Sequence, residues 1–341
     1  LPMSRRYELD LCRITACIMV IIIHAGSALY HSCPLYEPAF VPLCFISTAV
    51  RGSVPVFFML TGLLMLSRES LELGRFFKRH VLRLAGLFLL WSTLYALGSR
   101  AASGSFGSAY DFFFSVMAGH YHMWFICAMV TCCLFVPIMH AAIHGTKLDT
   151  RWLLGVFLFL VLLMQNCNLT PDPAYILNRF TLNFGFDYLP YLLYIIWGWY
   201  LGQREYGKRT LWIAPLVFLL TAVFTTVGNI WYSNYRGYAD GWLFSYFSLP
   251  NFIMASAMLC FFLSLKGHDF KRGELIHQLS DCTLGAYLLH PFMLNVLERF
   301  GIAVGLERPI SSLLSVAALC AVVCFAVSFV AKKIPVIRNL L

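Results

Sequence analysis

The sequence predicts an all-α polytopic membrane protein of about ten transmembrane helices, with both termini in the cytoplasm. Of its 341 residues, 60% are hydrophobic and 12% are charged, whereas a soluble domain usually holds about 25% charged residues. Apolar runs of about 20 residues recur along the whole chain, and each is long enough to cross the core of a bilayer. Lysines and arginines gather in alternate loops between these runs, which is typical of a multi-pass protein.

The predicted spans follow the apolar runs in order. They are 9–29, 45–66, 82–98, 123–143, 152–166, 187–202, 211–231, 243–265, 283–300 and 310–331. No polar stretch is long enough for a separate soluble domain, so a single membrane domain over residues 1–341 is expected. The first run lacks a small-residue cleavage pattern, which favours a retained helix over a signal peptide.

The loop charges give the orientation. Seventeen basic residues fall in the loops of one side and five in the loops of the other, with Arg51 near an edge. The positive-inside rule places both termini in the cytoplasm, and this requires an even number of spans. The same rule accounts for the net charge of +9, so no nucleic-acid partner is expected.

The cysteines and the absence of several sequence motifs limit the kinds of catalytic site that are expected. Most of the 12 cysteines lie inside apolar runs, where they behave as small hydrophobic residues. No metal-ligand spacing is present, so no metal is expected, while a disulfide between the loop residues Cys33 and Cys167 stays open. The sequence has no Walker, HExxH or GxSxG motif. No carboxylate lies near the middle of a span, which disfavours a proton-driven pump.

Arg13 and His24 are ionisable residues inside the first apolar run. Eleven residues make almost three helical turns, so the two side chains share a face, separated by a rise of roughly 16 Å. Asp10 lies three residues before Arg13 on that face. Such residues are costly in a bilayer and usually functional. The structural alternative is an Arg13–Asp10 pair with His24 as an interhelical hydrogen bonder.

A basic cluster follows the second span. It consists of Arg75, Lys78, Arg79, His80 and Arg83. A positive-inside anchor explains the first two residues well. Arg79 and Arg83 lie one turn apart at the start of an apolar helix, and a cytoplasmic phosphate-bearing ligand would suit them.

Three further segments stand out. The stretch 119–125, which contains His120, Tyr121, His122 and Trp124, has two histidines that an aromatic belt does not explain. The stretch 54–62 ends in a Thr–Gly pair, which suits either close helix packing or local unwinding of the helix. In the stretch 287–291, Pro291 frees a backbone carbonyl that His290 can bond, so a structural role for His290 stays open beside a functional one.

These segments together resemble the acyltransferase-3 family of bacterial membrane proteins. Arg13 and His24 resemble its Arg-x10-His motif, and the stretch 54–62 resembles its second segment, with Thr61 where Ser is commoner. Phe77 to Arg83 resembles its Arg-x3-Arg segment. Tyr121-His-Met-Trp-Phe125 is similar to Tyr-His-Leu-Trp-Phe, and Leu284 to His290 resembles its late Tyr-Leu-His segment. The resemblance extends along most of the chain.

The resemblance implies an enzyme that moves an acyl group, usually acetyl, from cytoplasmic acyl-CoA to a hydroxyl of a cell-surface glycan or its lipid-linked precursor. The family also includes succinyl transfer and domains linked to amino-acid export, so membership leaves the substrate open. The implied location is the bacterial plasma (inner) membrane. Acyl-CoA is expected as co-substrate, with no bound cofactor, and assembly into a homo-oligomer is left open.

The residues suggest a mechanism for such an enzyme. Arg75, Arg79 and Arg83 would hold the CoA phosphates, and His24 would act as general base. Arg13 and Asp10, on the same face nearer the cytoplasmic end of the helix, are the other catalytic candidates. Whether Glu37 assists His24 stays open. The acceptor or the oxyanion would be held by further side chains, which are His120, Tyr121, His122, Trp124, Tyr287 and His290. The alternative is a transporter of an amino acid or glycan precursor, which shares the buried histidines.

Overall fold

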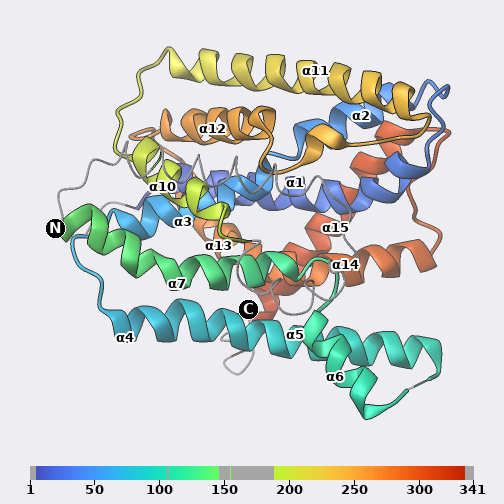
Figure 1. The fold of residues 1–341 in the computed structure, drawn as a ribbon, viewed down its shortest axis with the longest axis horizontal. Coiled ribbons are helices and arrows are strands. Elements are labelled where there is room, and N and C mark those ends of the chain that lie inside the picture. Colours follow the sequence, from blue (N-terminus) through green and yellow to red (C-terminus); the bar gives the residue numbers. More distant parts are fainter. Residues whose placement is uncertain (1–4, 106, 146–153, 155–187, 335–341) are drawn as a thin grey trace. The chain divides into compact units, whose positions relative to one another are not determined.

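The computed structural model describes residues 5–105, 107–145, 154 and 188–334. In this part of the chain every regular element is helical. The chain forms two compact units, one from residues 1–60 and 201–341 and one from residues 61–200. Helix α3, Ser53–Leu66, passes from the first unit into the second. Figure 1 labels the helices along the chain.

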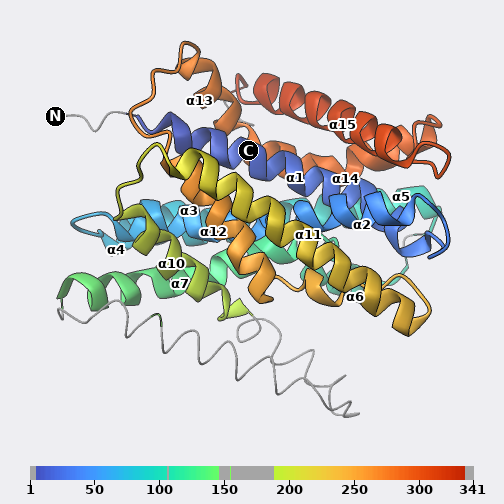
Figure 2. The same cartoon turned by 90° about the horizontal axis from the view of Figure 1, so that it is seen from above.

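Helix α1, Tyr7–Ser32, is the central element of the first unit. It packs against five helices of this unit, and Figure 2 shows it beside them. These are α2 (Phe40–Ala49), α12 (Leu249–Leu263), α13 (Gly273–Asp281), α14 (Thr283–Arg299) and α15 (Pro309–Ala331). Glu8 and Asp10 in the first turn of α1 complement the helix dipole.

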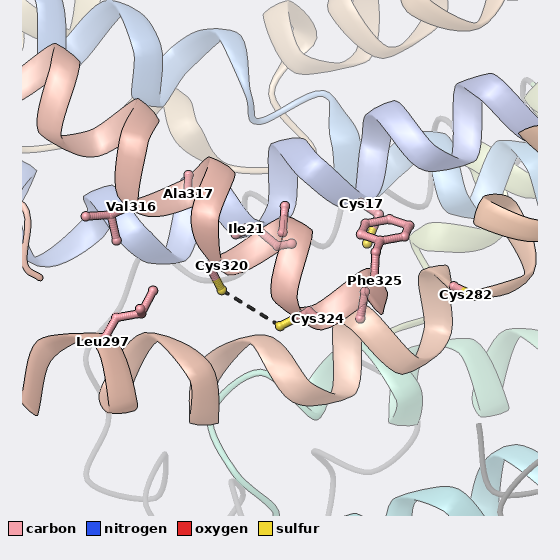
Figure 3. Close-up of a cluster of buried hydrophobic side chains, with 11 residues drawn as sticks. Cys17, Ile21, Cys282, Leu297, Val316, Ala317, Cys320, Cys324 and Phe325 are labelled. Atoms are coloured by element: carbon pink, nitrogen blue, oxygen red, sulfur yellow. Dashed lines mark hydrogen bonds between the residues drawn. The ribbon is translucent and has the colours of Figure 1, made fainter. Parts of the chain in front are cut away.

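The core of the first unit lies where α1 meets α14 and α15 (Figure 3). Cys17 and Ile21 of α1 pack there against Ala286 of α14 and Phe325 of α15. The thiols of Cys320 and Cys324 lie 3.9 Å apart among these apolar side chains. The cysteines therefore act here as small packing residues, as the sequence predicts.

The long helix α11, Thr210–Arg236, completes this unit with the short 3-10 helix η3, Trp242–Phe244. It packs against α12 and α2. The loop after α11 is tied to helix α1, because the hydroxyl of Tyr30 donates to the carbonyl of Asp240 at 3.1 Å. Ser233 of α11 also bonds this residue, through both the Asp240 N–H and its carbonyl.

The second unit is built around α5, Arg83–Ser103, and α7, Trp124–Gly145, which pack together. Its other elements are α4 (Leu73–Phe76), the π-helix η1 (Phe77–Leu82), α6 (Ala109–Ala118) and α10 (Tyr191–Gly202). The backbones of α3 and α10 approach each other closely. A Cβ added at Gly62 would lie 1.8 Å from the carbonyl oxygen of Ile195, so only glycine fits there.

Helices occupy nine of the ten predicted spans, and 152–166 lies outside the described residues. Among the residues that the structure describes, six helical stretches are long and apolar enough to cross a membrane by length and composition. They are Tyr7–Ser32, Phe40–Leu66, Leu73–Ser103, Trp124–Gly145, Thr210–Arg236 and Pro309–Ala331. The total of ten spans and the cytoplasmic termini stay predictions.

The predicted span 45–66 lies within the candidate span Phe40–Leu66. A short turn separates α2 from α3, and Pro55 lies in the first turn of α3. Two other local expectations were wrong. The stretch 99–121, between the predicted spans 82–98 and 123–143, is not a loop throughout. It contains the last five residues of α5 and all of α6, which begins with a capping box between Ser108 and Asp111. The expected loop before α14 contains the amphipathic helix α13.

Candidate active site

Arg13 and His24 both lie on the uninterrupted helix α1, so the predicted three-turn separation holds. Both side chains are partly buried. The helix is apolar between them, with buried Ala16, Cys17 and Val20. Arg13 and His24 therefore lie in separate polar places along one helix.

Arg13 belongs to a polar cluster that joins α1 to α13. Its Nη1 donates to the hydroxyl of Ser280 at 3.0 Å and lies 3.5 Å from the Oδ1 of Asp10. Asp10 is 8% exposed and also pairs with Arg5 at 3.5 Å. The predicted Asp10–Arg13 pair is confirmed, and Ser280 is a partner that the sequence did not indicate.

Helix α13 extends this cluster. Its His277 lies 4.0 Å from the Asp10 carboxylate and 3.3 Å from that of Asp281. The start of α13 is pressed onto α1, because a Cβ added at Gly273 would lie 2.7 Å from the ring of Tyr7. Arg13 and Asp10 thus hold α13 against the beginning of α1.

His24 lies against His290 of α14, with ring centroids 5.0 Å apart and an angle of 35° between the rings. His290 is 0% exposed. The ring of Tyr287 is 5.7 Å from that of His290. Three of the predicted site residues therefore meet at one place, although 266 residues separate His24 from His290 in the chain.

The orientation of His290 has a local cause in Pro291. Proline has no N–H, so Pro291 cannot donate to the carbonyl of Tyr287 four residues earlier. The Nδ1 of His290 lies 2.6 Å from that carbonyl oxygen. Since a carbonyl only accepts, Nδ1 carries the proton of the neutral ring. His290 thus bonds the carbonyl that Pro291 frees, as the sequence suggested.

The basic cluster lies on the helical stretch from α4 to α5. Arg75 pairs with Glu72 at 3.1 Å, and both side chains are largely exposed. Arg79 and Arg83 are exposed, and together with Arg68 they place His80 in a positive field. The segment around His80 is a π-helix, a form often found at functional sites. These three arginines offer an exposed positive surface to an anion.

His120 and His122 form a second histidine pair, on the turn before α7. Their Nδ1 atoms lie 2.9 Å apart, so one ring donates a proton and the other accepts it. Gly119 makes the turn with a φ of 71°. Tyr95 of α5 stacks on His120 at a centroid distance of 4.3 Å. His122 is buried, whereas Tyr121 is 58% exposed.

Trp124 is the first residue of α7, and its ring lies beside two tyrosines. It stacks on Tyr188 at 6.5 Å and lies 5.9 Å from the ring of Tyr191. Tyr95 is a neighbour of the pair that sequence reasoning missed, because a tyrosine in an apolar helix is already explained by packing. Within the described residues, no group of three or more His, Cys, Asp or Glu side chains is arranged to hold a metal ion.

The sequence model of one family, described as an acyltransferase domain, matches residues 6–332. The chain belongs to the acyltransferase-3 family. No curated protein and no solved structure matches it. The match runs from before Arg13 to the end of α15, so it includes every residue of both histidine pairs and of the basic cluster.

Family membership and the six long apolar helices make the chain a membrane acyltransferase. The two units contain different groups of the predicted site residues. The first unit contains the contact between His24 and His290, and the second contains the basic cluster and the pair of His120 and His122. The possible partner of Cys33, Cys167, lies outside the described residues, so that disulfide stays a prediction.

Burial lowers the pKa of His120 below its ordinary value of 6.5. Folding therefore favours the neutral ring. The resulting contribution to the free energy of unfolding is fully present above pH 6.5, and it is lost as the pH falls from 6.5 toward the lower pKa of the folded state. We expect the thermal midpoint to fall less steeply from about pH 7.5 to about pH 5.5 in His120→Asn than in the parent protein. His268→Asn, at an exposed loop position, should leave the parent slope unchanged. Equal slopes in the parent and His120→Asn would contradict this expectation.

Proposed function

We propose that this acyltransferase moves an acyl group, usually acetyl, from cytoplasmic acyl-CoA to a hydroxyl of a cell-surface glycan or its lipid-linked precursor. The observation that carries the proposal is the imidazole of His24. It lies partly buried in an apolar helix, against a second imidazole, in a chain of the acyltransferase-3 family. A neutral imidazole is the side chain best suited to accept a proton near pH 7.

The proposed reaction uses His24 as general base. His24 takes the proton of the acceptor hydroxyl while the hydroxyl oxygen attacks the thioester carbonyl carbon. The new C–O bond forms, the C–S bond breaks, and the thiolate of CoA receives the proton back from His24. No group other than the two substrates is consumed, which fits an enzyme without a bound cofactor.

The exposed arginines of the second unit are the proposed site for the CoA phosphates. Arg79 and Arg83 suit this role because their guanidinium groups are exposed, and Arg68 adds to the same positive field. Arg75 is a weaker candidate than the sequence suggested, because it already pairs with Glu72. Arg13 is likewise engaged, with Asp10 and Ser280, so its proposed role is to hold the helices of the site.

The acceptor side of the proposal rests on the second histidine pair. The exposed ring of Tyr121 beside His120 and His122 offers a stacking face and hydrogen-bonding groups, which is how proteins commonly hold a saccharide-like polar ligand. Trp124 and Tyr188 extend the aromatic surface of this unit.

Membrane vesicles that carry the native acceptor test the proposal. With [14C]acetyl-CoA supplied on the cytoplasmic face, label is expected in the saccharide fraction. Arg79→Ala and Arg83→Ala should each weaken acetyl-CoA binding about 10- to 100-fold, because hydrogen bonds to charged groups contribute about 1.5–3 kcal/mol. Arg236→Ala, at the C-terminal end of α11, is the matched control and should keep the parent affinity for acetyl-CoA.

Two results would count against this function. Movement of an unmodified saccharide across the vesicle membrane without acetyl-CoA, and with no label incorporated, would favour the transporter alternative. Unchanged acetyl-CoA affinity in both arginine variants would leave the basic cluster as a membrane anchor.

A further inference from the structure

His290 and Pro291 are consecutive residues of α14, and the ring of His290 lies next to that of His24. His290 is fully buried, and its ring touches that of His24 across the contact of α14 with α1. The carbonyl that Pro291 releases holds the Nδ1 proton of His290 at 2.6 Å. The ring is therefore fixed in one tautomer, and its other nitrogen, Nε2, carries the lone pair.

The surroundings of the His24–His290 contact are mainly apolar. Cys17 and Ile21, about two turns and one turn before His24 on α1, are buried in the core of the first unit together with Ala286 and Cys320. The thiol of Cys320 lies 3.7 Å from the carbonyl of His290. In such surroundings a hydrogen-bond acceptor beside a developing charge is worth more than it would be in water.

Among the described residues, the titratable side chains of the core beside His290 are cysteines, Cys17 of α1, Cys282 before α14, and Cys320 and Cys324 of α15. The ring of Tyr287 also lies beside that of His290. The carboxylate of Asp281 and the ring of His277 on α13 belong instead to the cluster around Asp10. In many enzymes a carboxylate orients the catalytic histidine, and in this structure the ring beside His24 is that of His290.

We propose that His290 is the positioning residue of His24. Its Nε2 accepts a hydrogen bond from the protonated His24 during acyl transfer, and Pro291 keeps that nitrogen available by freeing the carbonyl of Tyr287. The inference rests on the proposed role of His24 as general base. His290 keeps its own Nδ1 proton throughout, so it orients and stabilises His24 without entering the proton balance.

The substitution His290→Asn separates this role from a structural one. Its amide N–H lies where Nδ1 lies and can still bond the carbonyl of Tyr287, but it has no group at the place of Nε2. His290→Gln restores an amide group near that place. In the vesicle assay with [14C]acetyl-CoA we expect the turnover of His290→Asn to fall about 10- to 100-fold. Its apparent KM for acetyl-CoA and its thermal midpoint should stay near the parent values, and His290→Gln should recover part of the turnover.

Pro291→Ala gives an independent test that leaves His290 in place. Alanine at 291 supplies an N–H that competes for the carbonyl of Tyr287, so the tautomer of His290 is no longer fixed. We expect turnover to fall severalfold without loss of stability. Pro215→Ala, at the proline inside α11, makes the same chemical change in another helix and should keep the parent turnover.

The outcomes distinguish this inference from the proposed function. Full turnover in His24→Ala would overturn both. An inactive His24→Ala with full turnover in His290→Asn, or equal turnover in Pro291→Ala and Pro215→Ala, would overturn only the positioning role. The double variant His24→Ala/His290→Asn should be no slower than His24→Ala alone, and a further loss would mean that His290 does not act through His24.

Discussion

Replacing His24 with alanine should lower acyl transfer about 100- to 10,000-fold, which is the usual contribution of a positioned general base. The substitution removes the imidazole, which is partly buried, but keeps a good helix former in α1. The measurement is the initial rate of label incorporation from [14C]acetyl-CoA, normalised to the amount of folded protein.

His31→Ala is the matched control for this variant. His31 lies in the last turn of the same helix and is exposed, so its loss should leave the rate within about twofold of the parent. If His24→Ala retained the parent rate at equal expression, the general base would have to be sought elsewhere, with the pair of His120 and His122 as the next candidate.

Replacing Gly62 with alanine should strongly destabilise the second unit. The added Cβ would lie 1.8 Å from the backbone oxygen of Ile195, and a backbone atom cannot turn aside as a side chain can. Helices α3 and α10 would have to separate, at a cost of about 3 kcal/mol or more. A marked fall in the thermal midpoint in detergent, together with poor yield, is the expected result.

Two glycines of α5 provide controls with the opposite expectation. Nothing lies within 4 Å of a Cβ added at Gly86 or Gly98, and alanine is favoured over glycine in a helix by up to about 1 kcal/mol. Gly86→Ala and Gly98→Ala should therefore leave the thermal midpoint unchanged or raise it. A midpoint for Gly62→Ala equal to theirs would show that α3 and α10 do not pack at this distance.

The apolar runs predicted the long helices because a run that fills a bilayer is visible within a short window of sequence. The shorter elements gave weaker signals. Helix α13 has nine residues, too few for a periodic pattern to stand out from a polar loop. The π-helix η1 has no sequence signature. Helix α6 was detectable in principle, because Ser108 and Asp111 have the spacing of a capping box.

The individual site residues were easier to predict than their contacts. His24 and His290 stand out singly because an imidazole inside an apolar run is costly. That they touch follows from the packing of α1 on α14, which depends on the whole core and not on either segment. The bond from His290 to Tyr287 was open to prediction, because Pro291 leaves a carbonyl without its helical donor, a purely local effect.

The cluster that holds Arg13 has a consequence for how the chain is made. Ser280 follows Arg13 by 267 residues, and at the usual pace of about 5–20 residues per second a ribosome needs roughly 13–53 s to reach it. During that interval the first helix enters the membrane without its final partner. Asp10, one turn away on the same helix, is available from the start. We therefore expect the Asp10 carboxylate to pair with Arg13 while the rest of the chain is synthesised. Loss of this carboxylate should reduce the amount of inserted protein more than the activity of each finished molecule.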